Sequence, residues 1–369
     1  MLQNKQHRIK VLVAPLDWGL GHTTRCIPII YELLSLGIEI TVAGNTIQQT
    51  LLKKEFANLK YIELDGYNIL YSTNKKNFAW KILQQSPGII KAIKNEHEWL
   101  NELIENRHFD AVISDNRFGL YHEKIPCIFI THQLLIKNKF GNIAEKILQN
   151  FNYKYINQFS ECWIPDYEQQ PNLGNALSHP AKMPKIISKY LGALTRIQPM
   201  SIPTKKDHLL IILSGPEPQR GLFEKMLLQQ IPSYKGSVTI VRGLPASTEK
   251  LHTLPHITIH NHLSGEVLNR EICKAAYIVC RSGYSSVMDL INTNAIPVLV
   301  PTPGQPEQEY LAESLSKAKF CITAKQNQFS LTELLSTAQT FNRNNEYRLQ
   351  ENNLKKIIQG FVLKYLIKK

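Results

Sequence analysis

The chain has 369 residues, 43% of them hydrophobic and 20% charged, and these fractions exclude a disordered or fibrous protein. This length exceeds one ordinary domain and predicts two. The 43 lysines and arginines outnumber the 30 acidic residues, so the formal net charge is +13. Such a charge favours nucleic acid, an anionic membrane surface or a phosphorylated small molecule as partner. Because the basic residues are dispersed and no zinc-finger or RNA-recognition signature occurs, we expect no nucleic-acid partner.

The six cysteines form no C-x-x-C pair, which is typical of buried thiols in a reducing compartment rather than of disulfides or a zinc site. No stretch approaches the roughly 18 consecutive apolar residues of a membrane span. The apolar run over 9–16 is short for a signal peptide, and no small-x-small cleavage site follows it. We therefore expect a cytoplasmic protein.

The first third of the chain alternates short apolar runs with helical patterns. Ile9–Ala14 is typical of a buried strand, a helix is predicted over Thr23–Leu36, and Gly37 precedes a second strand at Ile38–Ala43. This is a βαβ unit, which predicts a parallel sheet. Three further strands are predicted at Tyr61–Leu64, Asp110–Ser114 and Cys127–Thr131.

The periodicity fades and prolines become frequent over Asp166–Asp207, with a linker predicted near Thr195–Lys206. A second alternation follows, with strands predicted at His208–Leu213, Ser237–Val241, Ile257–His260, Tyr277–Cys280 and Ile296–Val300. We therefore predict an α/β protein of two Rossmann-like, doubly wound domains facing across a cleft. The predicted divisions are 1–200 (first domain and linker), 201–345 (second domain) and 346–369 (a basic helix that packs back toward the first domain).

Residues 69–100 combine aromatic and aliphatic side chains with lysines, and Pro87 and Gly88 interrupt them. Two interpretations remain open. A basic amphipathic helical pair can rest on an anionic bilayer, which would place the protein peripherally on the inner face of the membrane. Alternatively, this is an ordinary helix pair packed on the first sheet, as most amphipathic helices are.

In open α/β sheets, ligands bind beyond the carboxyl ends of the strands. Four polar or glycine-rich turns follow predicted strands there, at 17–24, 114–119, 214–221 and 281–286. In the last of these, free N–H groups at the start of the following helix are suited to a diphosphate, with Asp289 in reach of a ribose diol. Ser285 is equally consistent with a plain N-cap. Two such turns in one domain indicate a nucleoside diphosphate ligand.

The run "CRSGYSSVMDLINTNAIPVLVPTPGQPEQEYLAESL" over 280–315 resembles the donor-binding region of the GT-B glycosyltransferases that include the bacterial peptidoglycan UDP-N-acetylglucosamine transferases. The similarity lies in the Arg-Ser-Gly turn, the acidic residue eight positions later, the Pro-x-x-x-Pro strand exit and the glutamine-rich "GQPEQE". Gly19, Gly21 and His22 resemble the family's glycine-rich turn ending in Gly-His. A dinucleotide fingerprint would need a glycine at Thr24, so hydride chemistry is disfavoured.

The resemblance implies a UDP-sugar donor held by the second domain. It implies that Asp289 binds the ribose hydroxyls, although the family more often has glutamate there, and that Gln308 contacts the donor sugar. Glu309 stands where the family often has glutamine or asparagine, which leaves the sugar open. The implied donor-binding set is Gly21, Ser214 and Gly215 near the diphosphate, His262 and Leu263 at the uracil, the Arg281–Ser282–Gly283 turn with Ser285, and Asp289, Gln308 and Glu309.

Glycosyl transfer needs a base for the acceptor hydroxyl and positive electrostatics at the leaving phosphates. His22 suits the first task, and Arg281 with the helix N-termini suits the second, so no cofactor or obligatory metal is expected. Asp115 and Asn116 follow another strand and either orient His22 or the acceptor, or form a solvated turn. His132 also follows a strand that faces the cleft. His22 itself is alternatively a capping or packing residue.

The leading hypothesis is an inverting, metal-independent hexosyltransferase with a UDP-sugar donor. N-acetylglucosamine or a related hexose is the expected sugar, and a glycan or lipid-linked hydroxyl compound is the expected acceptor, bound by the first domain. Two alternatives remain open at this point. A UDP-sugar epimerase can use the same fold, and a non-catalytic nucleotide-sugar-binding subunit would bind the donor without turnover.

Overall fold

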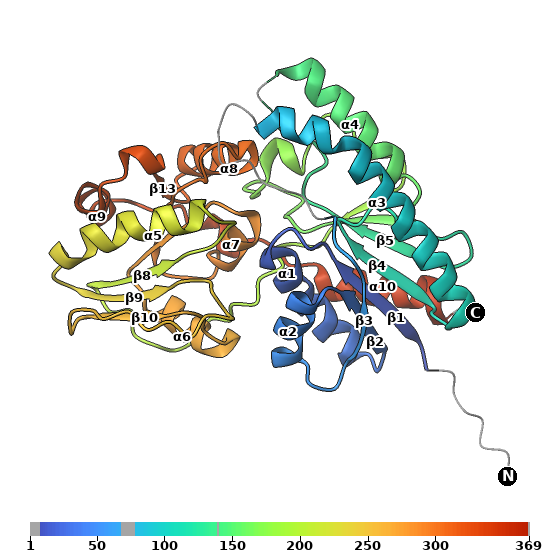
Figure 1. Cartoon of the computed structure of the whole chain (residues 1–369), viewed down its shortest axis with the longest axis horizontal. Coiled ribbons are helices and arrows are strands. Elements are labelled where there is room, and N and C mark those ends of the chain that lie inside the picture. Colours follow the sequence, from blue (N-terminus) through green and yellow to red (C-terminus); the bar gives the residue numbers. More distant parts are fainter. Residues whose placement is uncertain (1–7, 68–77, 139, 368–369) are drawn as a thin grey trace, which may run out of the picture.

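The computed structural model describes residues 8–67, 78–138 and 140–367, and over 78–87 it describes the backbone. Its strands form two separate parallel sheets (Figure 1). The first has the order β3-β2-β1-β4-β5-β6-β7 and defines the N-terminal domain; the second has the order β10-β9-β8-β11-β12-β13 and defines the C-terminal domain. The first sheet contains β1 (Lys10–Pro15), β2 (Glu39–Gly44), β3 (Lys60–Glu63), β4 (Ala111–Asp115), β5 (Cys127–Ile130), β6 (Glu161–Ile164) and β7 (Ile187–Tyr190). The second contains β8 (His208–Ile212), β9 (Ser237–Val241), β10 (Ile257–His260), β11 (Tyr277–Cys280), β12 (Ile296–Leu299) and β13 (Ile322–Thr323).

Helices connect the strands and cover the sheets, which confirms the predicted fold class of two Rossmann-like domains (Figure 1). The central strands are buried along nearly their whole length because helices pack on both faces, so they show continuous apolar runs. The N-terminal domain carries α1 (Leu20–Ser35), α2 (Thr46–Glu55), α3 (Phe78–Asn106) and α4 (Asn142–Ile156). The C-terminal domain carries α5 (Gln219–Gln230), α6 (Gly265–Lys274), α7 (Tyr284–Asp289), α8 (Pro306–Lys317) and α9 (Leu331–Gln339), and α10 (Leu354–Phe361) follows.

The helix α3 differs from the predicted helical pair. It runs through Pro87 and Gly88 as one element, because apolar residues recur every three to four positions on both sides of them. In the part whose side chains are described, Ile93 and Leu100 are buried while Ile90 and Lys91 are exposed, which is the ordinary pattern of a helix packed on its sheet. The side chains of 78–87, and all of 68–77, lie outside the described residues.

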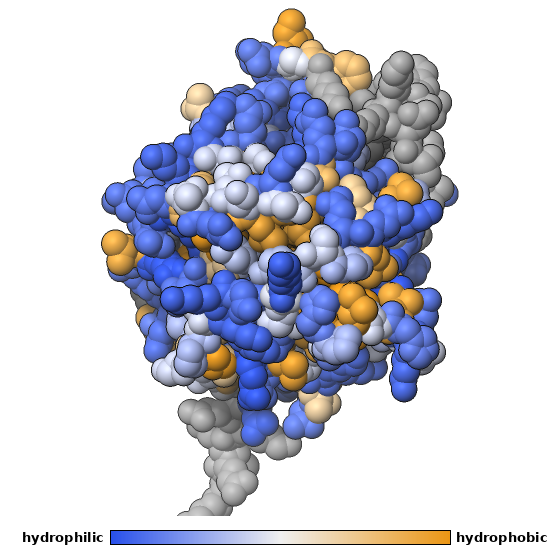
Figure 2. All heavy atoms as spheres, turned by 90° about the vertical axis from the view of Figure 1, so that its left-hand side faces the viewer, coloured by the Kyte–Doolittle hydropathy of each residue, from blue (hydrophilic) through white to orange (hydrophobic). Residues whose placement is uncertain are grey.

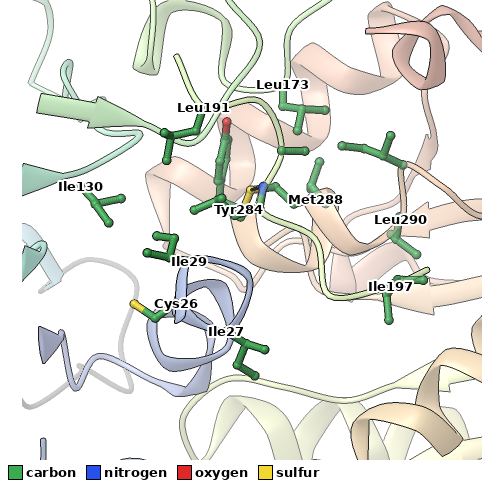
Figure 3. Close-up of a cluster of buried hydrophobic side chains, with 14 of the residues drawn as sticks. Cys26, Ile27, Ile29, Ile130, Leu173, Leu191, Ile197, Tyr284, Met288 and Leu290 are labelled. Carbon is green, nitrogen blue, oxygen red and sulfur yellow. Dashed lines mark hydrogen bonds between the residues drawn. The ribbon is translucent and has the colours of Figure 1, made fainter. Parts of the chain in front are cut away.

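One apolar cluster joins the two domains. Cys26, Ile27 and Ile29 of α1 and Tyr284 and Met288 of α7 belong to the same buried cluster, and Figure 3 shows these residues on neighbouring elements. Burial of such side chains stabilises by about 1.5 to 3 kcal/mol each. Residues 191–205 have no regular secondary structure and connect β7 to β8. The relative position of the two carboxyl-terminal sheet edges is therefore set by a packed interface and not by the connection alone.

The last described residues return to the N-terminal domain. Phe361 of α10 contacts Trp163 of β6 edge to face at 5.4 Å, and both rings are buried. The backbone N–H of Asn353 donates to the carbonyl of Leu191 at 2.9 Å. Figure 1 shows α10 beside the first sheet, whereas the elements that precede it in sequence belong to the C-terminal domain.

Candidate active site

The turn after β1 begins the site. Gly19 has φ +84°, a conformation that favours glycine, and its backbone caps the start of α1. The following residues Gly21 and His22 therefore lie in the first helical turn, at the carboxyl edge of the first sheet. β4 pairs directly with β1 and ends at Asp115. Neighbouring parallel strands thus bring His22 and Asp115 together, although 93 positions separate them.

His22 and Asp115 share Arg25 as a third partner. His22 Nδ1 lies 3.2 Å from Asp115 Oδ2 and 2.9 Å from Arg25 Nη2. Arg25 Nε donates to Asp115 Oδ2 at 2.7 Å, and Arg25 Nη2 donates to Oδ1 of the same carboxylate. Arg25 and Asp115 are fully buried, whereas the His22 side chain is 14% exposed. The exposed member of this group is thus the one proposed to act on a substrate.

The charges of this group set its protonation. Burial opposes ionisation of Asp115, but Arg25 and His22 more than offset it and lower the pKa of Asp115 to about 2. Burial, and then the Arg25 guanidinium, lower the pKa of His22 below its ordinary value despite the neighbouring carboxylate. At neutral pH the site therefore combines an ionised aspartate with an uncharged histidine.

His132 extends this group to the other domain. It follows β5, and Arg25 Nη1 lies 3.0 Å from His132 Nδ1. On its other side His132 Nε2 lies 2.7 Å from Glu307 Oε1, in the first turn of α8. Gln133 Nε2 donates to Glu307 Oε2. A continuous set of polar contacts therefore runs from His22 through Arg25 and His132 to the C-terminal domain.

The turn after β11 faces the start of α1. Ser285 Oγ donates to the carbonyl of Gly21 at 3.0 Å, and a Cβ added to Gly21 would lie 2.9 Å from Ser285 Oγ. Only glycine fits here without a shift of the neighbouring serine. Ser282 is buried and donates to the carbonyl of Gln308 at 2.8 Å, while Gly283 provides the backbone cap of α7. The residues of this turn are thus close to His22 across the domain interface.

Arg281 lies apart from the site. Its side chain is 1% exposed, and its guanidinium donates to the carbonyls of Gln219, Val300 and Pro301. The guanidinium also stacks over the Phe223 ring at 4.3 Å, and burial lowers the pKa of Arg281 to about 10. Contrary to the expected contact with phosphates, the side chain turns inward and cross-links the end of the second sheet to α5.

Asp289 meets the inter-domain connection. Its carboxylate accepts from Thr195 Oγ1 at 3.2 Å and from the backbone N–H and Nε of Arg196 at 3.3 Å each. Burial raises the pKa of Asp289, although the Arg196 guanidinium opposes that shift. A ribose diol would therefore have to share this carboxylate with the linker.

The remaining predicted donor residues lie at the carboxyl edge of the second sheet. Gln308 Oε1 accepts from the backbone N–H of Thr302 at 2.8 Å, and Glu309 Oε1 accepts from that of Gly304 at 3.0 Å. Gly215 has φ +100°, next to the half-buried Ser214. A Cβ added to Gly215 would lie 3.9 Å from Thr302 Oγ1. This buried hydroxyl finds no hydrogen-bond partner within the described ranges.

His262 lines a pocket of about 570 Å³ at the open end of the domain interface. Lys54 of α2 contributes from the N-terminal domain, and the other walls come from Pro245–Leu251 and Ile259–Asn261. Leu263 beside it is buried in the shared apolar cluster. The structure thus separates the predicted donor residues into a pocket around His262, a group around Thr302 and the α7 turn.

Two residues of the site were missed by sequence reasoning. Arg25 stands one helical turn after His22 in α1, and this i, i+3 spacing places both on one face; the predicted helix begins only at Thr23 and leaves His22 out. Glu307 lies within the quoted "GQPEQE" run, but its partners His132 and Gln133 are over 170 residues away, and no local pattern indicates such a contact. In the described ranges, no three His, Cys, Asp or Glu side chains are grouped as metal ligands.

The chain is similar in sequence to known proteins. Residues 267–363 match the model of the glycosyltransferase family 28 C-terminal domain. A protein of Methanosarcina acetivorans described as an uncharacterized glycosyltransferase is 23% identical over 330 residues, which cover 82% of each chain. A second, from Methanosarcina mazei, carries the same description and is 22% identical over 322 residues, again 82% of each chain.

Solved structures share the whole fold. The calicheamicin glycosyltransferase CalG4 superposes with a TM-score of 0.64 at 12% identity, over 98% of this chain and 100% of that one. MurG of Acinetobacter baumannii superposes with a TM-score of 0.57 at 15% identity, over 97% and 99% of the two chains.

None of the helices in the described ranges has the length and apolar character that crossing a bilayer requires. The chain therefore has the GT-B fold, and its residues 267–363 are similar to the C-terminal domain of glycosyltransferase family 28.

Proposed function

We propose that the chain is a glycosyltransferase that moves a hexosyl group, N-acetylglucosamine or a related hexose, from a UDP-sugar to a hydroxyl group of its acceptor. The reaction inverts the anomeric centre and requires no metal. The observation that carries the proposal is the 3.2 Å contact between the partly exposed His22 and the buried Asp115, opposite the start of α7. A histidine oriented by a buried carboxylate is a common form of general base.

The proposed step uses few groups. The proposed base needs the His22 tautomer with its proton on Nδ1, which Asp115 Oδ2 accepts, and with a lone pair on Nε2. In this tautomer Arg25 Nη2 donates to Asp115 Oδ1 and not to His22 Nδ1. Nε2 takes the proton of the acceptor hydroxyl while the hydroxyl oxygen attacks the anomeric carbon. The bond from that carbon to the β-phosphate oxygen breaks, and UDP leaves with the electron pair. Attack opposite the leaving group inverts the configuration.

We place the donor along the edge of the second sheet. The pocket around His262 has room for a nucleoside base, and its Lys54 and Lys250 suit an anionic ligand, because the carboxylate of Glu249, which also lines the pocket, is paired with Arg242. The unpartnered hydroxyl of Thr302 beside Gly215 is suited to a phosphate or sugar oxygen. Positive charge at the leaving phosphates then comes from backbone N–H groups at the turns after β8 and β11, because Arg281 is turned inward.

A binding and activity series tests the donor. Calorimetry with UDP, UDP-N-acetylglucosamine, UDP-glucose and GDP-mannose should show a preference for the uridine compounds. Transfer should persist in EDTA. Preferential binding of the purine compound would contradict the assignment, and so would conversion of the UDP-sugar to its epimer without any acceptor.

His22→Ala tests the base. The variant should lose about 10²- to 10⁴-fold in kcat, the usual contribution of a general base, and should bind UDP as the wild type does. Unchanged transfer would refute the role of His22, whatever donor is used.

We further propose a lipid-linked acceptor presented at an anionic membrane, supported by an apolar stripe on α4. Ile143 and Ile147 are 80% and 64% exposed on one face of α4, and Phe140 and Phe151 continue this stripe. The exposed Lys146 and Lys154 flank it. By contrast, Figure 2 shows a largely hydrophilic face on the C-terminal domain, with scattered apolar residues. An apolar helical stripe with flanking lysines is suited to the interface of an anionic bilayer.

The double variant Ile143→Glu, Ile147→Glu tests this docking. It should bind vesicles of phosphatidylcholine and phosphatidylglycerol at least about fivefold more weakly, because two apolar side chains that would enter the bilayer become anionic. The matched control Leu222→Glu, Leu349→Glu changes two exposed leucines elsewhere and alters the net charge equally. If both variants lost vesicle binding equally, the loss would come from the change in net charge alone, which would contradict docking through the stripe on α4.

A further inference from the structure

His132 has no part in the proposed proton transfer, yet it is buried between two polar partners from different domains. Its Nδ1 lies 3.0 Å from Arg25 Nη1, and its Nε2 lies 2.7 Å from Glu307 Oε1. Its ring stacks on Tyr284 of α7, with centroids 3.9 Å apart and planes 12° from parallel. Three contacts therefore fix this one imidazole.

The donors and acceptors determine which nitrogen of His132 carries the proton. A guanidinium has no lone pair to offer, so the Nδ1 that contacts Arg25 must accept. In a neutral imidazole the proton is then on Nε2, which donates to the Glu307 carboxylate. Glu307 stays an acceptor at neutral pH: burial opposes its ionisation, but His132 lowers the pKa of this carboxyl below its ordinary value.

Arg25 connects His132 to the proposed base His22. Its Nε and Nη2 bind both oxygens of Asp115, while its Nη1 binds His132. A planar guanidinium that makes all these bonds has one orientation. Because Nη2 also lies 2.9 Å from His22 Nδ1, rotation of Arg25 would change the partner of that nitrogen and hence the tautomer of His22.

Glu307 comes from the first turn of α8, immediately before Gln308, so the chain of contacts begins in the C-terminal domain. Gln133 holds the second oxygen of the same carboxylate. When the two domains are in the contact seen here, Glu307 aligns His132, and His132 aligns Arg25. Separation of the domains would remove Glu307 from this set.

We propose that His132 is a positioning residue that makes the orientation of the base depend on the closed contact between the two domains, acting through Arg25 and held by Glu307. This inference rests on the proposed role of His22 as base. It assigns His132 no contact with either substrate. The proposal predicts that variants of His132 have a lower kcat but bind the donor as the wild type does.

The variant His132→Phe keeps an aromatic ring for the Tyr284 stack and removes both nitrogens. Its kcat should fall by at least about tenfold, since small displacements of a catalytic group are costly, while UDP-sugar binding by calorimetry stays within about twofold of wild type. His132→Gln offers an oxygen to Arg25 and an N–H to Glu307, and should recover about half of the wild-type kcat. If His132 had only a structural role, His132→Phe would lower the thermal stability, and kcat and donor binding would fall together.

Glu307→Ala provides a second measurement on a surface-accessible partner should His132→Phe not fold. It should lower kcat in the same way, whereas Glu313→Ala, an exposed glutamate on the same helix that pairs with Lys317, should match the wild type. Wild-type kcat in both His132→Phe and Glu307→Ala, with His22→Ala inactive, would overturn the inference and leave the base intact. Weaker donor binding in proportion to the lost activity would also overturn it. An active His22→Ala would instead refute the proposed base itself.

Discussion

The buried aspartate at the centre of the site is kept charged by its neighbours. Asp115 has no exposure to solvent, and a carboxylate in that position is stable only if its oxygens are paired. Arg25 supplies two donors to it, and His22 lies beside it. The same group of contacts thus explains both the local stability and the charge distribution that general-base chemistry requires.

The pH dependence of stability follows from this pairing. The pKa of Asp115 is about 2 in the folded protein against 3.8 unperturbed, so its stabilising contribution is present above about pH 4 and is lost as the pH falls toward 2. Its size is about 2 kcal/mol. We expect Asp115→Asn to be less stable than wild type at pH 6, because the buried Arg25 loses its anionic partner, and the difference to narrow between about pH 4 and 2. Urea unfolding across this range measures it; a difference that does not change with pH would contradict the pairing.

At the scale of elements, α10 belongs to the core of the N-terminal domain. Phe361 fills space against Trp163, and Ile358 of the same helix is buried in the same apolar cluster. Lys364 continues this contact by pairing with the buried Glu161. A segment at the far end of the sequence thereby completes the covering of the first sheet (Figure 1).

Phe361→Ala should lower the free energy of unfolding by about 3 to 5 kcal/mol, because it removes a buried ring and leaves a cavity against Trp163. The control Leu363→Ala changes an exposed side chain two positions away and should stay within about 0.5 kcal/mol of wild type. Chemical denaturation gives both values. A small effect of Phe361→Ala would mean that α10 is not part of the domain core.

For the whole molecule, the contact between the domains combines an apolar cluster with directional polar bonds. The cluster around Ile29 and Met288 resists separation, and the bonds of Glu307 and Ser285 fix the relative position of the sheet edges. The net charge of +13 gives the molecule as a whole a field that attracts anions.

This field predicts a salt dependence. With a soluble neutral acceptor, kcat/KM for the UDP-sugar should fall several-fold between about 20 and 200 mM KCl, because salt screens the attraction of the anionic donor. The KM of the neutral acceptor should change little. Equal loss for both substrates would indicate a general effect on the protein and contradict electrostatic attraction of the donor.

Much of the fold follows from local patterns. The continuous apolar runs of the central strands and the 3.6-residue period of the helices predict the alternation that the structure has. Three strands, β6, β7 and β13, are not predicted by the sequence. The strands β7 and β13 lie at sheet edges and lack apolar runs because an edge strand is buried on fewer sides, and the short β6 begins with the charged residue Glu161. The proline and glycine within α3 indicated a break, but the continued apolar period across them outweighs their local preference.

The sequence by itself determined the two-domain α/β architecture, the glycine-rich turn before His22 and the resemblance to glycosyltransferases, because each depends on residues close together in the chain. Only the tertiary structure decided that Arg281 turns inward, that Asp289 meets the linker, and that His132 and Glu307 join the domains. These contacts depend on how two sheets pack against each other. No local spacing encodes a bond between side chains 175 positions apart.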